Sequence, residues 1–180
     1  MAKVLVMYHS NYGVTKKYAE WIASELNADI YSVNNINQSI LVNYDTIILG
    51  GGLYAGSIKG INLLINHFEN IKNKKLIIFT CGLADYSRIE HQNEINNRLK
   101  KKIPGEIFKI IKIFYFRGGI NYKKLSFIHK IMMWLMKVVT EKKGIEKLND
   151  EDKEFLLTYG KTLDFSDKSS IAELVEYCKQ

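Results

Sequence analysis

The chain has 180 residues, of which 47% are hydrophobic and 25% charged, with a formal net charge of +7. This is an ordinary balance for a globular domain with a sizeable core, and it excludes the disordered class. Two cysteines, Cys81 and Cys178, are too few and too far apart for a disulfide scaffold or a paired-cysteine metal site, so we expect both to be reduced. The start lacks a signal-peptide pattern and no apolar run reaches membrane-spanning length, which predicts a cytoplasmic protein.

The positive charge lies in one part of the sequence. Residues 1–97 hold 8 basic and 8 acidic side chains, residues 98–147 hold 14 and 3, and residues 148–180 hold 4 and 8, so the balances of 0, +11 and −4 add up to +7. A localised positive field attracts acidic partners or anionic lipid headgroups. The alternative is a solvated lysine-rich surface without a partner.

Strands and helices alternate along the chain. Apolar runs predict five strands at Val4–Tyr8, Asp29–Val33, Thr46–Leu49, Leu76–Thr80 and Ile107–Phe116. Helical spacing predicts helices at 14–26, 58–68, 90–101 and 125–139, a short segment near 36–42, and a final pair within 150–178. The crossovers are long enough for parallel strands, so we expect one α/β domain over residues 1–180, with a doubly wound parallel sheet between two helical layers.

The turn between the first strand and the first helix has the residues of a phosphate site. Hydroxyl groups, glycine and backbone N–H groups would converge on the positive end of the helix. The predicted phosphate-binding residues are Ser10, Asn11, Tyr12, Gly13, Val14 and Thr15. The turn lacks the Gly-Lys-Ser/Thr ending of a Walker loop and the repeated glycines of a dinucleotide fingerprint. A plain Ser/Gly turn that caps a helix is the alternative.

Glycine-rich loops also follow the third and fourth strands. Ligands of doubly wound sheets bind outside the carboxyl ends of the strands, and glycines let backbone approach a flat ring closely. The predicted ring-binding residues are Gly51, Gly52, Leu53, Tyr54, Ala55 and Gly56 in one loop, and Thr80, Cys81, Gly82, Leu83, Ala84 and Asp85 in the other. Tyr54 could instead pack on the next helix, and Cys81 could be a small buried hydrophobe.

The segment Tyr8-His9-Ser10-Asn11-Tyr12-Gly13-Val14-Thr15 resembles the phosphate signature of the flavodoxin family, and the two ring loops strengthen the resemblance. It implies the flavodoxin-like strand order 2-1-3-4-5 and FMN as cofactor. Residues 10–15 would then hold the phosphate, 51–56 one side of the ring, and 80–85 the other. The family's aromatic stacking residue after the fourth strand is missing unless Tyr86 serves. Asp85 could face the ring edge or cap the following helix.

The last third departs from the acidic electron-carrier flavodoxins, because this chain is basic. The segment 116–126 and the apolar helix after it are similar to the flavodoxin-domain subfamily that includes menaquinone-dependent protoporphyrinogen IX dehydrogenase, whose members have an added segment after the fifth strand and work at the membrane surface. The helix at 125–139 could cover the sheet, line an apolar substrate site, or lie in a membrane interface among anionic lipids.

The resemblance predicts an FMN-binding protein in electron transfer or flavin-dependent oxidation and reduction. Its partner would be a redox protein, a quinone or a small-molecule substrate, with possible peripheral contact to an anionic membrane. FMN supplies the chemistry, so we expect no catalytic side chain, and the histidines lack metal-ligand spacing. A protoporphyrinogen or quinone dehydrogenase at the membrane surface is one alternative. A flavin-free module is another, although a phosphorelay receiver needs aspartates where Tyr8, His9 and Ser10 stand. We expect no nucleic-acid binding.

Overall fold

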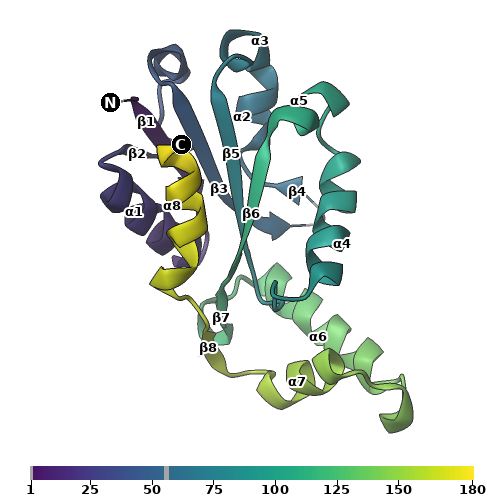
Figure 1. The fold of residues 1–180 in the computed structure, drawn as a ribbon. Coiled ribbons are helices and arrows are strands. Elements are labelled where there is room, and N and C mark those ends of the chain that lie inside the picture. The colour runs from purple at the N-terminus through teal and green to yellow at the C-terminus, as the bar shows by residue number, and fades with distance from the viewer. Residues whose placement is uncertain (1, 55–56) are drawn as a thin grey trace. The chain divides into compact units, whose positions relative to one another are not determined.

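A mostly parallel β-sheet forms the centre of the larger of two compact units into which the chain divides (Figure 1). The structure is a computed structural model that describes residues 2–54 and 57–180. The first unit comprises Met1–Gly118 and Phe165–Gln180, and the second comprises Gly119–Asp164. The expectation of one domain over residues 1–180 stays a prediction.

The sheet of the first unit has the predicted order. Its parallel strands are β1 (Val4–His9), β2 (Asp29–Ser32), β3 (Thr46–Tyr54), β5 (Lys75–Gly82) and β6 (Lys112–Arg117), arranged as β2-β1-β3-β5-β6. This arrangement is the expected 2-1-3-4-5 order of a flavodoxin-like α/β fold, which is therefore confirmed. A short sixth strand, β4 (Ser57–Ile58), pairs antiparallel with the end of β3. The central strands are continuous apolar runs because helices cover both of their faces.

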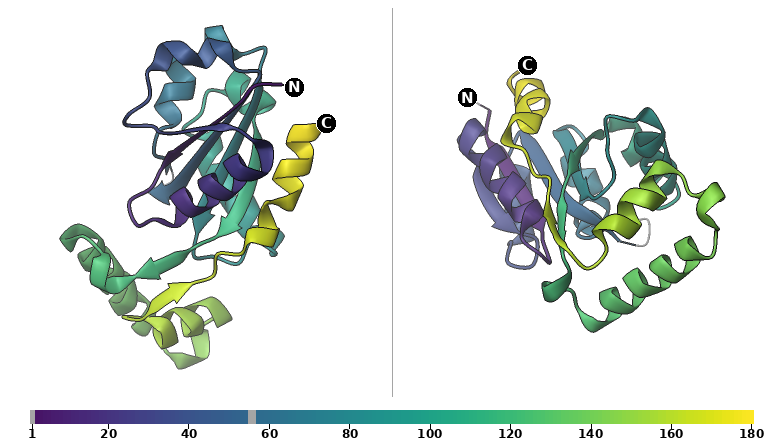
Figure 2. Two further views of the ribbon diagram at one scale, coloured as in Figure 1. Left: turned by 90° about the vertical axis from the view of Figure 1, so that its left-hand side faces the viewer. Right: turned by 90° about the horizontal axis from the view of Figure 1, so that it is seen from below.

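Helices cover the two faces of this sheet in separate layers (Figure 2, left). α1 (Val14–Leu26) and α8 (Ala172–Lys179) lie side by side over one face, where Tyr18, Ile22 and Leu174 are buried. The other face carries α2 (Ile61–Asn66), α3 (Phe68–Ile71), α4 (Ile89–Lys100) and α5 (Gly105–Ile110). Two 3-10 turns complete the unit, η1 (Gln38–Asn43) and η4 (Lys168–Ile171).

Several predicted elements have other bounds in the structure. The third and fourth strands were predicted to end at Leu49 and Thr80, but β3 continues to Tyr54 and β5 to Gly82, so both glycine-rich segments begin as strand and not as loop. The run predicted as a strand over Ile107–Phe116 divides into α5 and β6, because Pro104 stands at the N-cap of α5 and Ile107 is buried on the helical side. The helix predicted over residues 58–68 begins later, since Gly60 adopts φ +93° at the N-cap of α2. That left-handed conformation interrupts a helix and favours glycine.

The second unit is built from a small sheet and helices. β7 (Gly119–Asn121) pairs antiparallel with β8 (Thr162–Asp164), a pairing that sequence patterns did not predict. Between them lie η2 (Tyr122–Lys124), α6 (Phe127–Glu141), η3 (Ile145–Lys147) and α7 (Asp150–Thr158), so the predicted helix at 125–139 is confirmed. The Ser126 side chain caps α6, and Asn149 with Asp152 forms a capping box on α7. Among the described residues, no helix is both long and apolar enough to cross a bilayer.

Candidate functional site

The predicted phosphate turn forms a tight loop between β1 and α1. The Gly13 N–H donates to Ser10 Oγ at 3.0 Å, and the Lys17 N–H donates to the Gly13 carbonyl at 2.9 Å. Gly13 is the N-cap of α1 with φ +99°, and nothing lies within 4 Å of the place where its Cβ would be. Glycine is needed here for its backbone conformation, while the surrounding space stays open.

The start of α1 offers unused donors. The backbone N–H groups of Val14, Thr15 and Lys16 have no hydrogen-bond acceptor within the part of the chain that the structure describes, and no side chain caps the helix. The first turn of α1 carries no acidic residue. Free N–H groups at the positive end of a 13-residue helix, with no carboxylate to repel an anion, fit a phosphate group.

The end of β3 lies beside this loop in the sheet. Gly51 pairs with His9 on one side and with Thr80 on the other, so the ends of β1, β3 and β5 share one edge. A Cβ on Gly50 would lie 2.0 Å from Cζ of Phe79, and one on Gly51 would lie 2.4 Å from the Ile58 side chain. The glycines therefore let neighbouring side chains pack against bare backbone. Of the other predicted residues here, Gly52 and Leu53 are half-buried at the end of β3, whereas Ala55, Gly56 and the side chain of Tyr54 lie outside the described residues.

The end of β5 and the loop after it divide into an enclosed and an accessible part. Thr80 and Cys81 are buried, whereas Gly82, Ala84 and Asp85 are half-buried and Leu83 is exposed. Burial raises the pKa of the Cys81 thiol to about 12, against a smaller opposing effect from its hydrogen bond with Thr15. The thiol is thus neutral at physiological pH, and its surroundings match the small buried hydrophobe weighed above.

Asp85 is part of the turn that leads into α4. Its Oδ1 accepts the Ser87 N–H at 3.0 Å, and this hydrogen bond is the main cause that lowers the pKa of Asp85. Tyr86 is buried and packs on Tyr115 with ring centroids 5.8 Å apart. Its hydroxyl lies 2.0 Å from where a Gly82 Cβ would stand. In this arrangement the Tyr86 ring belongs to the core and leaves no free face for stacking.

Two buried polar atoms at the sheet edge have no partner among the described residues, namely His9 Nδ1 and Thr80 Oγ1. Burial, followed by the charge of Lys59, lowers the pKa of His9, so its ring is neutral at pH 7. Unpaired buried polar atoms are costly and often mark functional sites. His9 was absent from the predicted site, because its significance depends on the register that places it beside Gly51 and Thr80.

Backbone contacts also join the end of β6 to the loop after β5, which the sequence did not indicate. The Gly118 N–H donates to the Gly82 carbonyl at 2.6 Å, and Arg117 Nε donates to the Leu83 carbonyl at 3.2 Å. The Arg117 guanidinium also stacks over the Phe165 ring at 3.9 Å. These contacts fix the outer side of the 82–85 loop, and Arg117 places one positive charge beside it.

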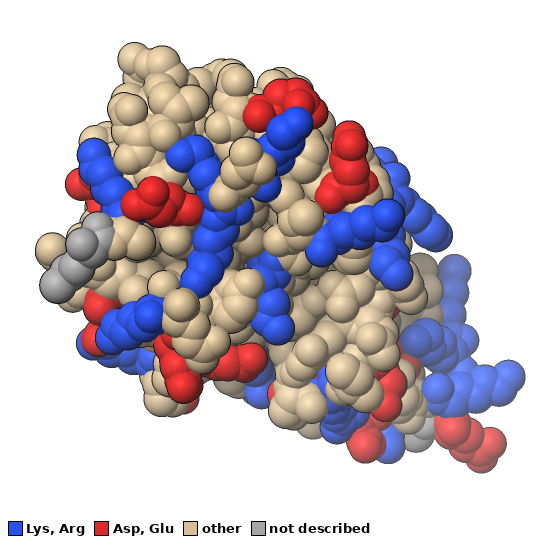
Figure 3. Space-filling model, turned by 45° about the horizontal axis from the view of Figure 1, so that its top comes forward, with Lys and Arg blue, Asp and Glu red and all other residues tan. Residues whose placement is uncertain are grey.

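The basic region of the sequence is divided between the two units. Seven of its 14 basic residues belong to each unit, from Arg98 to Arg117 in the first and from Lys123 to Lys147 in the second. On the face shown in Figure 3, basic and acidic side chains are interspersed. The concentration of charge in residues 98–147 is therefore a property of the sequence that the fold divides between the units.

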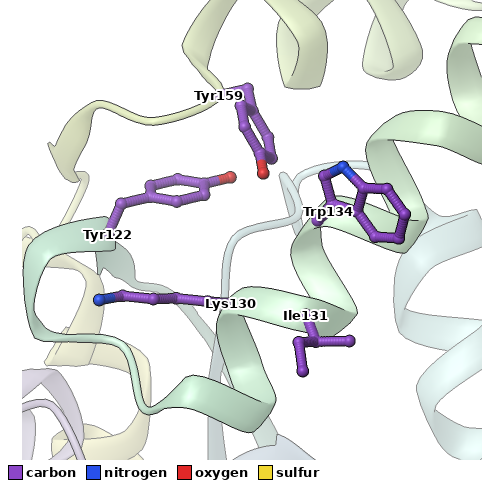
Figure 4. A pocket seen from close by; sticks show the side chains of 5 residues that line it. All are labelled: Tyr122, Lys130, Ile131, Trp134 and Tyr159. Carbon is purple, nitrogen blue, oxygen red and sulfur yellow. The ribbon is translucent and has the colours of Figure 1, made fainter.

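A separate open cavity of about 440 Å³ lies within the second unit (Figure 4). Tyr122 of η2 and Tyr159, which follows α7, bring their rings to 5.1 Å between centroids at 62°. α6 contributes Lys130, Ile131 and Trp134 to the lining. Three aromatic rings, one aliphatic side chain and one ammonium group suit a flat apolar molecule that carries a polar or anionic group.

Comparisons with known proteins give a family match and several similar structures. The family model described as a flavodoxin domain matches residues 5–146. An uncharacterized protein of Methanocaldococcus jannaschii is 34% identical over 128 residues, which cover 66% of this chain and 85% of the relative. A putative flavoprotein from Bacteroides eggerthii shares 16% identity at a TM-score of 0.47, covering 75% of this chain and 96% of that one. A flavoprotein from Lactobacillus acidophilus in complex with FMN shares 17% identity at a TM-score of 0.41, covering 65% and 93%.

Proposed function

This chain belongs to the flavodoxin domain family, and we propose that it is an FMN-binding flavoprotein that acts in electron transfer or as a flavin-dependent oxidoreductase. The observation that carries the proposal is the shared edge of β1, β3 and β5, where uncapped N–H groups, glycines and unpaired polar atoms come together. The N–H groups and the two polar atoms lack partners that a bound flavin nucleotide would supply.

The residues of the proposed site have two tasks, phosphate binding and contact with the flavin ring. Ser10 and Gly13 hold the loop that aims the N–H groups of Val14, Thr15 and Lys16 at a phosphate. The second task, contact with the flavin ring, falls to residues 51–56 and 82–85, with Thr80 and Cys81 behind them as enclosed support. When bound, FMN supplies the one- or two-electron chemistry, and the protein binds it, orients it and sets its potential.

Paired titrations with FMN and riboflavin test this proposal, because the two flavins differ only in the phosphate. The chain should quench FMN fluorescence with a dissociation constant well below that for riboflavin. Ser10→Ala removes the acceptor of the Gly13 N–H and should weaken FMN binding while riboflavin binding changes little. Ser126→Ala removes another serine hydroxyl that accepts a backbone N–H, that of His129 in the second unit, and serves as the control. Unquenched FMN, or equal affinity for both flavins, contradicts the proposal.

A quinone-type or porphyrin-type dehydrogenase is the more specific candidate. The segment 116–126 resembles that of the protoporphyrinogen dehydrogenase subfamily, and the aromatic cavity of the second unit suits a flat apolar substrate. In this case Tyr122, Trp134 and Tyr159 hold the ring system, and Lys130 binds a carbonyl or carboxylate group.

Trp134 fluorescence tests this candidate in a Trp21→Phe background, where it is the one remaining tryptophan. Menadione, a soluble quinone, should quench Trp134 in a saturable way, and Tyr122→Ala should raise the half-saturating concentration several-fold. Leu157→Ala, at an exposed position of the same unit, is the matched control. Quenching that is linear in quinone, or unchanged by Tyr122→Ala, would show that the cavity does not bind this class.

A further inference from the structure

α6 exposes apolar side chains over more than half of its circumference. Phe127 is 77% exposed and Ile128 is 68% exposed. At about 100° per residue, the exposed positions cover a sector of roughly 200°. These positions form the apolar face of α6 and comprise Phe127, Ile128, Ile131, Met132, Trp134, Leu135, Met136 and Val139. An apolar surface of this extent on one helix indicates an interaction site.

The opposite side of α6 packs against the rest of the second unit. Thr140 is buried, and His129, Met133 and Lys137 are half-buried. α6 packs beside α7, and Lys137 lies over the Tyr159 ring at 5.6 Å. The helix is thus anchored by its narrower side and leaves most of its apolar side exposed, the reverse of a helix that covers a core; within that side, Ile131 and Trp134 also line the cavity with Tyr122 and Tyr159.

Lysines stand at both ends of this face. Lys123 and Lys124 precede the helix and Lys142 and Lys143 follow it. Residues 119–147 contain seven lysines and two glutamates, a balance of +5. Lys143 pairs with Asp152 at 2.9 Å and Lys137 with Glu141 at 2.7 Å. Among the described residues, no carboxylate lies within ion-pair distance of Lys123, Lys124, Lys130 or Lys142.

An anionic bilayer surface is the occupant that matches both features. A 15-residue helix is about 22 Å long, too short to span a hydrocarbon core of about 30 Å, but suited to lie along its boundary. Apolar side chains would then enter the acyl region while lysines at both ends reach lipid phosphates. A second copy of the chain fits less well, because its apolar face would bring the same lysines and therefore like charges.

We propose that the apolar face of α6 docks on a membrane that contains anionic lipid, with the helix axis in the plane of the interface. The docking needs no flavin, so its failure and the failure of flavin binding can be told apart.

Vesicle sedimentation with the full chain tests the proposal, using phosphatidylcholine vesicles with and without 30% phosphatidylglycerol. The chain should bind the anionic vesicles at least tenfold more tightly, and added salt should weaken binding. Phe127→Ser with Ile128→Ser should weaken binding about tenfold, as should Lys123→Glu with Lys124→Glu. The matched controls are Leu157→Ser, a 72% exposed apolar residue, and Lys101→Glu with Lys102→Glu, an exposed lysine pair of the first unit.

A second measurement reports insertion directly. In the Trp21→Phe background, Trp134 emission should shift to shorter wavelength on anionic vesicles, because the ring leaves water. Absence of binding to either vesicle overturns the proposal. So does binding that responds to the lysine variants but not to the Phe127 and Ile128 variants, since that is adsorption by charge alone. Self-association that these serines abolish, without vesicle binding, would instead make the face a dimer interface.

Discussion

Gly13→Ala, compared with Gly160→Ala, separates backbone strain from flavin binding. Gly13 has φ +99° and Gly160 has φ +83°, and at neither position does any atom lie within 4 Å of the added Cβ. Each substitution therefore costs only the left-handed strain of a residue with a side chain, about 1–2 kcal/mol. For a chain of this size each kcal/mol lowers Tm by about 2–4 °C, so either variant should lose roughly 2–8 °C.

The two variants should differ in FMN affinity. If the backbone of the Gly13→Ala variant relaxes out of the left-handed region, the N–H of the substituted residue leaves Ser10, and the N–H groups of Val14 and Thr15 turn away from the phosphate. One hydrogen bond to a charged group contributes about 1.5–3 kcal/mol, which corresponds to about a 10- to 100-fold rise in Kd. Gly160→Ala should leave Kd unchanged.

The assay is fluorescence titration of FMN at a temperature where both variants are folded, with Tm from circular dichroism. Equal losses of FMN affinity in both variants would refute the reasoning, because strain in the second unit would then matter as much as the loop. Unchanged affinity in both would show that the turn after β1 does not hold the phosphate.

Three further substitutions test the packing and hydrogen bonding around the proposed site. Gly50→Ala places a Cβ 2.0 Å from the buried Phe79 ring and should lower the free energy of unfolding by about 1–3 kcal/mol. Gly105→Ala meets open space and is the control, so an equal Tm for the two variants would contradict the packing at Gly50. Tyr18→Phe removes the hydroxyl that donates to the Arg117 carbonyl at 2.8 Å and accepts the Asp167 N–H at 3.1 Å. We expect the free energy of unfolding in urea to fall by about 1–3 kcal/mol. No fall would mean that the Arg117 carbonyl and the Asp167 N–H find other partners. The pKa of Cys81 rises from 9.0 to about 12 on folding, so only the unfolded state releases this proton between these values and stability falls with rising pH. Wild type should therefore lose more stability than Cys81→Ala between pH 7 and pH 10.5, and equal losses would place the thiol in contact with solvent.

The sequence predicted the elements whose pattern is strong and local. The bounds of α1 agree with the prediction at both Val14 and Leu26, because apolar residues recur on one face between a glycine N-cap and Asn27 at the C-cap. α5 was missed because the run from Ile107 to Ile110 is short and apolar, and such a run has no period that distinguishes a strand from a helix.

The site was predicted at the level of loops but not of atoms. Ser10 and Gly13 follow from local turn chemistry, which a sequence shows directly. The unpaired His9 Nδ1 and the enclosure of Thr80 depend on how β1, β3 and β5 align across the sheet. Strand register and the pairing of β7 with β8 arise from contacts between residues far apart in the chain, and local periodicity does not encode them.

Backbone amide chemical shifts during an FMN titration test the central claim most directly. With ¹⁵N-labelled protein, the largest changes should appear in residues 10–16, 51–53 and 82–85, which lie at or directly after the carboxyl ends of β1, β3 and β5. The amides of Val14, Thr15 and Lys16 should move with FMN but much less with riboflavin. Chemical-shift changes that do not include these segments, or that concentrate in residues 119–164, would contradict a flavin site at this edge of the sheet.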